Sequence, residues 1–274
     1  MLKYHLVIEA GRSKSQYWRD LWQFRELFYF LAWRDVLVRY QQPVIGASWA
    51  LIKPLLTMVV FTIVFGKIAK LPSGGAPYPI MVFVAMLPWQ FFSTSFAEAG
   101  NSLVVNAPMI SKVYFPRLIL PTSTVIVSLI DFLISFAIML ALMVWYRFVP
   151  DIKILLLPLF FLLVFMASIA GGLWIAALNV RYRDFRYIIP FVVQFGLYIS
   201  PVGFSSAVIP EKWRLLYSLN PMVGVIDGFR WAVLGGEYQL YWPGFLLSIL
   251  LVVVILFSGI AYFRKTEKTF ADVI

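Results

Sequence analysis

The stretch ILLLPLFFLLVFMASIAGGLWIAALNV, residues 154–180, decides the fold class because its 27 residues include no charged side chain. A helix needs about 20 predominantly apolar residues to cross the hydrocarbon core of a bilayer. Three more uncharged stretches are similarly long, at residues 71–97, 187–210 and 238–263. These four stretches predict membrane-spanning helices.

Two further spans become visible when a single interruption is allowed. Residues 44–65 are interrupted only by Lys53, and residues 118–146 only by Asp131. We therefore predict an all-α integral membrane protein with spans near 44–66, 78–103, 118–146, 154–179, 187–204 and 243–263. On this division, residues 1–43 form an N-terminal region, 44–263 a six-helix transmembrane domain and 264–274 a tail.

The composition also indicates a protein that is embedded in lipid. The chain is 62% hydrophobic and only 13% charged, whereas soluble domains are about 45–50% apolar and about 25% charged. It contains no Cys and a single His, His5, which excludes disulfides and thiolate metal sites and leaves little for His-based catalysis. We expect no metal site and no catalytic residue.

The basic excess, a net charge of +10, is interpreted as an orientation signal rather than as a nucleic-acid-binding surface. Six spans put both termini on one side. Most Lys and Arg residues fall on that side, and fewer fall on the other, namely Lys67, Lys70, Arg147, Lys153, Lys212, Arg214 and Arg230. The positive-inside rule then places both termini in the cytoplasm. We expect no cleaved secretory signal, because charges occur throughout the first forty residues.

The segment WRDLWQFRELFYFLAWRDVLVRYQQ, residues 18–42, has helical spacing and ends before Pro43. Aromatic and polar residues occupy different faces, which predicts an interfacial helix on the cytoplasmic leaflet. This helix could be a simple anchor, or its polar ridge could also contact a cytoplasmic partner. The ridge consists of Gln16, Arg19, Gln23, Glu26 and Arg34.

Two short cytoplasmic loops follow, VVNAPMISKVYFPRLILP at 104–121 and LNVRYRDFRYIIP at 178–190. In the first, Pro108 and Pro116 bracket a stretch of about two helical turns that carries Lys112. The arginines of the second loop are explained either by positive-inside anchoring alone or by a specific role.

The outer connection, residues 205–242, is apolar but is interrupted by several Pro and Gly residues. Residues 211–219 and 222–234 are each long enough for a short helix, separated by the turn signal Asn220-Pro221. Broken helices at membrane depth are tolerated where protein or a wet cavity surrounds them, which favours re-entrant helices near a translocation path. A pair of helices lying on the membrane surface is the alternative.

Chemical motifs are few. The sequence contains no GxxxxGK[ST], HExxH or GxSxG motif, so it offers no P-loop for ATP and no standard hydrolase site. Glu98 and Asp131 are ionisable residues within predicted spans, which makes them functional candidates. Either could instead be structural, with Glu98 paired to a base and Asp131 to a partner inside the bundle.

Five segments together resemble one known family. They are RYQQPVIGASWALIKPLL (39–56), PWQFFSTSF (88–96), SKVYFPRLILP (111–121), NVRYRDFRYIIPFVVQFGLYISPV (179–202) and SLNPMVGVIDGFRW (218–231). In order and spacing they are similar to the membrane (permease) subunit of polysaccharide-exporting ABC transporters of the O-antigen type, whose relatives export capsule and teichoic acid. The resemblance extends from Trp18 to Lys268.

The resemblance implies a homodimer of this chain in the bacterial inner membrane with two copies of a separate ABC ATPase. That ATPase would bind ATP and Mg, so this chain would be a permease subunit rather than an enzyme. The cargo would be a polysaccharide linked to polyprenyl pyrophosphate. The implied ATPase-coupling residues are Asn106, Met109, Lys112, Tyr114, Arg19 and Glu26, and the candidates for the pyrophosphate or lipid head are Arg34, Arg39 and Arg181.

Aromatic side chains are the expected sugar contacts, because the C–H face of a pyranose stacks on an aromatic ring. The same residues could equally be bulk facing lipid or protein. Two other classes stay open: a proton-coupled secondary transporter that uses Asp131 and a membrane enzyme acting on polyprenyl lipids. The candidate channel-lining residues are Phe61, Trp89, Phe91, Phe92, Phe195 and Tyr198.

Overall fold

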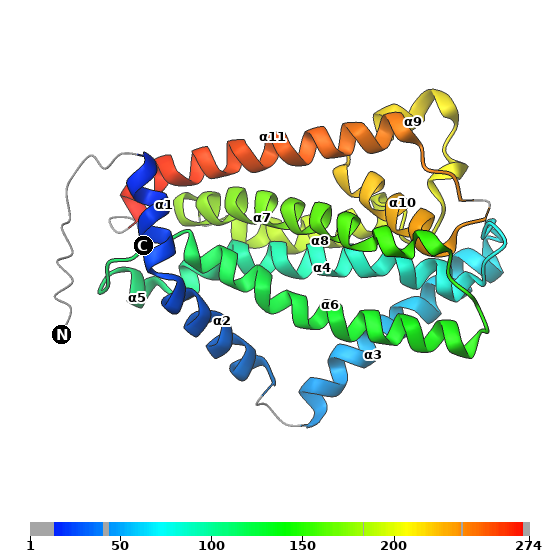
Figure 1. Cartoon of the computed structure of the whole chain (residues 1–274), viewed down its shortest axis with the longest axis horizontal. Coiled ribbons are helices and arrows are strands. Elements are labelled where there is room, and N and C mark those ends of the chain that lie inside the picture. The colour runs from blue at the N-terminus through cyan, green and yellow to red at the C-terminus, as the bar shows by residue number, and fades with distance from the viewer. Residues whose placement is uncertain (1–13, 41–43, 183, 237, 271–274) are drawn as a thin grey trace.

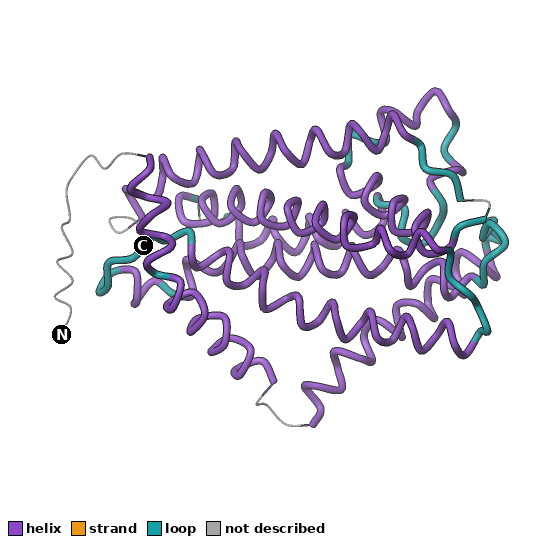
Figure 2. The backbone as a smooth tube through the Cα atoms, in the orientation of Figure 1, coloured by secondary structure: helices purple, strands orange, loops and turns teal. Residues whose placement is uncertain are grey.

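The computed structural model describes residues 14–40, 44–182, 184–236 and 238–270, and within these ranges it is helical and contains no strand. The long helices run side by side as one elongated bundle (Figure 1), with loops gathered mainly at its two ends (Figure 2). The all-α prediction is confirmed for the described residues.

The elements follow the predicted order. They are α1 (Lys14–Gln23), α2 (Arg25–Tyr40), α3 (Val44–Phe61) with the π-helix η1 (Thr62–Ile68), α4 (Tyr78–Val105), α5 (Ala107–Ile110), α6 (Ile119–Trp145), η2 (Ile152–Leu156), α7 (Leu157–Arg181), α8 (Phe185–Ile199), η3 (Ser206–Val208), α9 (Glu211–Tyr217), α10 (Pro221–Leu234), α11 (Trp242–Thr266) and η4 (Glu267–Thr269).

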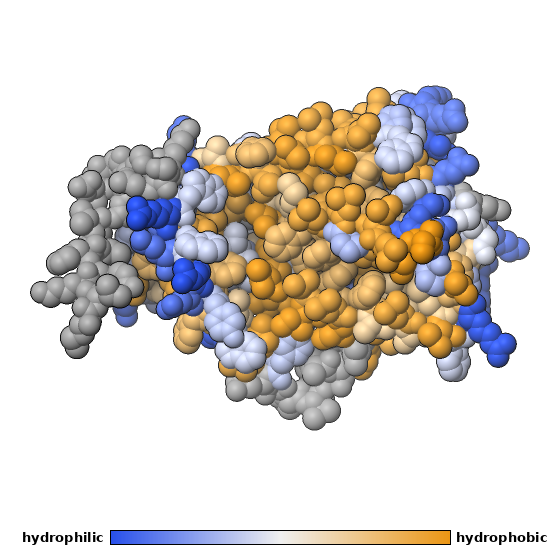
Figure 3. All heavy atoms as spheres, viewed as in Figure 1, coloured by the Kyte–Doolittle hydropathy of each residue, from blue (hydrophilic) through white to orange (hydrophobic). Residues whose placement is uncertain are grey.

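Four helical segments of the described chain are long and apolar enough to cross a membrane: Tyr78–Val105, Ile119–Trp145, Ile152–Arg181 and Trp242–Thr269. They correspond to four of the six predicted spans. The other two predicted regions are also helical, as α3 with η1 and as the shorter apolar helix α8. Figure 3 shows a broad apolar surface between hydrophilic ends, as expected for a multi-pass membrane protein.

Helix α4 is the centre of the bundle. It packs against α6, α7, α8 and α10, and every residue from Ile80 to Leu87 is at most 5% exposed. A helix that is apolar on all sides is stable only when it is surrounded, and α4 meets this condition through its neighbours. The polar groups described below lie on α4 or on helices near it.

The two short helices predicted in the outer connection are present as α9 and α10. The side chain of Asn220 accepts the backbone N–H of Met222 at 3.0 Å, and Pro221 occupies the first turn of α10, an arrangement that favours helix initiation. Arg230, which the sequence analysis counted among the cations of the outer side, is 1% exposed. Its guanidinium donates to the carbonyl oxygens of Val202 at 2.9 Å and Phe204 at 2.7 Å.

The predicted interfacial helix differs from expectation. It is divided at Phe24 into α1 and α2, although backbone hydrogen bonds from Phe24 to Asp20 and from Phe28 to Phe24 continue through the division. Helix α2 packs along α6 (Figure 1). Of the proposed polar ridge, the side chain of Gln16 lies outside the described residues.

The loop between α4 and α6, which the sequence predicts to be cytoplasmic, contains less helix than predicted. Helix α5 is a single turn that includes Pro108, so this proline lies within the helix instead of bracketing it. Lys112 and Tyr114 follow α5 in turn and bend conformations. A proline is well tolerated in a first helical turn, and Pro108 is the second residue of this helix.

Candidate functional site

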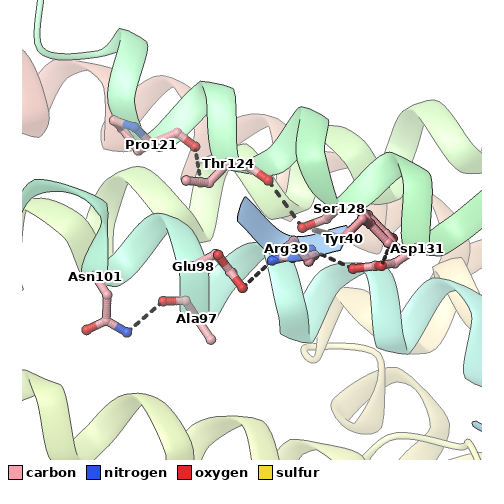
Figure 4. A network of polar contacts seen from close by, with 9 residues as sticks. All are labelled: Arg39, Tyr40, Ala97, Glu98, Asn101, Pro121, Thr124, Ser128 and Asp131. Atoms are coloured by element: carbon pink, nitrogen blue, oxygen red, sulfur yellow. Dashed lines mark hydrogen bonds and ion pairs between the residues drawn. The ribbon is translucent and has the colours of Figure 1, made fainter. Parts of the chain in front are cut away.

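A cluster of charged side chains joins three helices inside the bundle. Arg39, near the end of α2, donates from Nη1 to Oδ2 of Asp131 on α6 at 2.6 Å. Its Nη2 donates to Oε1 of Glu98 on α4. The Tyr40 hydroxyl donates to Oδ1 of Asp131 at 2.5 Å. Figure 4 shows the guanidinium of Arg39 between the two carboxylates.

The two carboxylates of this ionic cluster lie well away from the ends of α4 and α6. Glu98 is seven residues before the end of α4, and Asp131 is twelve residues after the start of α6, or about 10 and 18 Å along the helix axes. Ionised groups at such depth are costly unless they are paired. The side chains of Arg39 and Asp131 are each 23% exposed and that of Glu98 is 43% exposed. Pairing with Arg39 therefore explains the presence of Glu98 and Asp131, whose roles the sequence left open.

A cavity of about 460 Å³ opens beside this cluster, between α2, α4 and α6. Arg34, one turn before Arg39, pairs with Asp35 at 2.7 Å and donates to Oδ1 of Asn106 at 3.2 Å. The cavity lining consists of Arg34, Asp35, Val38, Arg39, Ala97, Glu98, Asn101, Ser102, Val105, Asn106, Thr124 and Val127. Two of the three predicted head-group arginines, Arg34 and Arg39, are thus brought together.

The charge balance of this region differs from that of a simple anion site. The two positive charges of Arg34 and Arg39 are outnumbered by three carboxylates. Arg34 is paired with Asp35, and Arg39 is paired with Glu98 and Asp131. An anionic ligand would therefore have to compete with these carboxylates for the arginines.

Arg181 lies elsewhere. It ends α7, is exposed, and places its guanidinium 5.4 Å from the centre of the Tyr182 ring. It is not part of the cavity lining. The structure therefore separates this arginine from the other two head-group candidates.

Two rows of polar residues, which the sequence analysis missed, run along the facing sides of α4 and α6. They recur at helical spacing of three or four, and this spacing was the signal that could have revealed them. The α4 row is Gln90, Thr94, Glu98 and Asn101, and the α6 row is Thr124, Ser128, Asp131 and Ser135. The hydroxyls of Thr124 and Ser128 donate to carbonyls of their own helix, at 2.9 and 3.2 Å, so they are satisfied without a ligand.

The predicted ATPase-coupling residues lie near one end of the bundle, where α1 and α5 are found (Figure 1). Lys112 and Tyr114 are exposed beyond α5, and Arg19 and Glu26 are exposed on α1 and α2. Asn106 immediately precedes α5 and is held by Arg34, while Met109 is half-buried.

The six aromatic candidates do not form one surface. Phe61, Trp89 and Phe91 are at most 6% exposed. The ring of Phe91 packs against Phe132, Phe161 and Phe165, and Phe92 is half-buried beside Trp89. By contrast, Phe195 and Tyr198 on α8 are 53% and 59% exposed.

Comparison with known proteins gives the chain its family. Residues 26–234 match the family described as ABC-2 type transporter. The O-antigen export system permease protein RfbA of Myxococcus xanthus is 29% identical over 259 residues, which cover 93% of this chain and 97% of that protein.

Two other relatives are similar over most of their length. RfbA of Klebsiella pneumoniae, also named an O-antigen export system permease protein, is 26% identical, with 88% of this chain and 92% of that protein covered. The polysialic acid transport protein KpsM of Escherichia coli is 24% identical, with 86% and 91% covered. Because the family match spans most of the sequence, including all three members of the ionic cluster, this chain belongs to the ABC-2 type transporter family.

Proposed function

We propose that this chain is the permease subunit of an ATP-driven ABC exporter. The exporter moves lipid-linked polysaccharide from the cytoplasmic side across the bacterial inner membrane, and the proposed polysaccharide is O antigen. The observation that carries this proposal is near full-length similarity to permeases whose names specify O-antigen export. Export of a capsule polymer is the second candidate, supported by the similarity to KpsM.

The proposed topology has six spans and cytoplasmic termini. The four long apolar segments support four of the spans, and α3 with η1 and α8 provide helices for the other two. Helices α9 and α10 are proposed to be re-entrant from the outer side. The packing of α10 against α4, α7 and α11 supports this proposal, because a broken helix at membrane depth needs protein around it.

The proposed assembly is a homodimer of this chain with two copies of a separate ATPase that binds ATP and Mg. The lack of a P-loop in this sequence is consistent with a separate motor subunit. The exposed residues Lys112, Tyr114, Arg19 and Glu26 are proposed to contact it, with Asn106 and Met109 supporting α5. Their location near one end of the bundle supports a single docking surface.

The pyrophosphate of the lipid carrier is proposed to enter the cavity that Arg34 and Arg39 line. Its oxygens would replace Asp35 and Glu98 as partners of the guanidinium groups, since arginine binds phosphate and carboxylate with the same planar fork. Arg181 would meet lipid head groups separately, at the end of α7. For the glycan, the exposed rings of Phe195 and Tyr198 are the proposed stacking surface.

Pairing also favours this mechanism over proton coupling. A carboxylate that carries a transported proton has to change its protonation state during each cycle, whereas Asp131 accepts from both Arg39 and Tyr40. Both of its oxygens are thus occupied by donors from α2, which ties the side chain to a neighbouring helix. We therefore propose a structural role for Asp131.

The test is to co-express the chain with the ABC ATPase encoded beside it, purify the pair in nanodiscs, and measure ATP hydrolysis with and without polyprenyl-linked glycan. Stable association and glycan-stimulated hydrolysis are expected. A chain that purifies alone would contradict the proposal. In parallel, the polymer restored to the surface of a permease-deletion strain, O antigen or capsule, distinguishes the two candidate cargoes.

A further inference from the structure

One carboxylate at the cytoplasmic end, which the site described above does not use, joins three distant segments of the chain. Glu267 directly follows α11. Its Oε2 accepts from the Tyr17 hydroxyl of α1 at 2.8 Å, and its Oε1 accepts from the backbone N–H of Arg117 at 2.7 Å. The Arg117 guanidinium also donates to the backbone carbonyl of Glu267.

An apolar core and a neighbouring cation surround the contact between Glu267 and Tyr17. Beneath it lies a second apolar core that includes Ile110, Phe115 and Phe263, and Tyr17 packs against that core. The guanidinium of Arg264 lies 4.6 Å from the centre of the Tyr17 ring. Burial, followed by the negative charge of Glu267, raises the pKa of Tyr17 above its ordinary value. The phenol therefore keeps its proton and donates at neutral pH.

The contact completes a pair of attachments around α5. Asn106, immediately before α5, is bound by Arg34 of α2 at 3.2 Å. Arg117, beyond α5, is bound by Glu267. The segment 106–117, which carries the proposed docking residues Lys112 and Tyr114, is thus held at both ends. One attachment leads to α2, and the other leads to α1 and α11.

We propose that Glu267 is a positioning residue that unites α1, the segment 106–117 and the C-terminal end of α11 into one body, so that a displacement of α5 by the ATPase moves all three together. This inference rests on the proposed function, because it assumes an ATPase that acts on α5. Its physical basis is that elements cross-linked by several hydrogen bonds over a shared apolar core move as a unit.

The chemistry of the carboxylate explains why Glu fits this position. Its two oxygens accept from two different donors at once. In Glu267→Gln the amide oxygen can still accept from the N–H of Arg117, and the amide nitrogen can donate to the Tyr17 hydroxyl. In Glu267→Ala both side-chain contacts are lost. Comparing these two variants therefore separates the effect of losing the negative charge from the effect of losing the side-chain contacts with Tyr17 and Arg117.

The first experiment measures, without any ATPase, whether α1 and the segment 106–117 are held at a fixed distance from each other. Because the chain contains no Cys, spin labels can be placed on Trp18→Cys in α1 and Val113→Cys in the loop, both of which are exposed positions. The expected result is a narrow distance distribution in the parent and in Glu267→Gln, and a broadened one in Glu267→Ala. Lys268→Ala, an exposed neighbour, is the matched control and should match the parent. An unchanged distribution in Glu267→Ala would overturn the inference.

The second experiment uses the complex with the ATPase and measures polysaccharide exported per ATP hydrolysed, normalised to folded complex. A residue needed only for stability would lower the amount of complex but leave this ratio unchanged. We expect Glu267→Ala to lower the ratio by at least about fivefold, the lower end of typical energetic coupling between sites, and Glu267→Gln to retain most of it. A parental ratio in Glu267→Ala would refute the role of Glu267.

The two experiments also separate this inference from the proposed function. If the parent chain associates with no ATPase, the proposed function fails and so does the transmission role assigned to Glu267. The distance measurement would then still decide whether Glu267 joins the three segments.

Discussion

Removing the positive charge of Arg39 should destabilise the bundle, and removing its two partner charges as well should restore most of the loss. In Arg39→Gln, Glu98 and Asp131 would keep their negative charges without the guanidinium that binds both of them. An uncompensated buried charge costs about 3–5 kcal/mol. The carboxylates are 43% and 23% exposed, and Asp131 retains the Tyr40 hydroxyl. We therefore expect the low end, about 3 kcal/mol.

The neutral variant Arg39→Gln/Glu98→Gln/Asp131→Asn distinguishes charge from shape. It keeps side chains of similar size that can still form hydrogen bonds, so its free energy of unfolding should return to within about 1 kcal/mol of the parent. Thermal unfolding of the purified chain in nanodiscs is the assay. For a chain of this size, about 3 kcal/mol corresponds to a Tm lower by roughly 6–12 °C.

Two results would refute this reasoning. Parental stability of Arg39→Gln would mean that the ion pairs contribute nothing, and a neutral variant as unstable as Arg39→Gln would mean that the shape of the arginine, not its charge, matters. A single variant, Asp131→Asn, which keeps Arg39, tests transport: ATP-dependent export that survives without the Asp131 carboxyl would exclude proton coupling through it.

Three further outcomes are expected. Replacing Lys112 and Tyr114 by Ala should reduce glycan-stimulated ATP hydrolysis without reducing the amount of folded chain, because both are exposed; unchanged stimulation would argue against their coupling role. Tyr198→Ala should lower export with little loss of stability, whereas Phe91→Ala, 2% exposed, should destabilise the fold by about 3–5 kcal/mol, as measured by thermal unfolding. Arg230→Gln leaves backbone carbonyls unpaired beneath α10 and should cost about 2–3 kcal/mol; a parental Tm would contradict this.

Local signals in the sequence predicted much of the fold. Uncharged length identified the long helices, and the Asn220-Pro221 pair located the start of α10 correctly because its capping contact spans only two residues. The loop between α4 and α6 was predicted less well. The two prolines suggested two helical turns between them, but Pro108 lies inside a single turn that begins at Ala107 and ends at Ile110, since a proline is tolerated in the first turn of a helix as well as at its boundary.

The charged site could not be assembled from the sequence. Arg39 is separated from Glu98 by 59 residues and from Asp131 by 92, and helical periodicity does not specify which helices become neighbours. The prediction of an interfacial helix did not specify the helix against which it packs. Only the packing of α2 along α6 brings the guanidinium to the two acids.

The attachments of α2 limit how the bundle could respond to the proposed ATPase. Its far end is fixed to α4 and α6 through Arg39, and its middle is fixed to the start of α5 through Arg34 and Asn106. A movement of α5 that left α4 and α6 in place would have to separate charges in a partly buried environment, which is costly. A movement in which α2 carries α4 and α6 with it keeps every pair intact. The lower-energy response is therefore a movement in which α2, α4 and α6 keep their positions relative to one another, together with α1 and the end of α11, which Glu267 ties to the same segment.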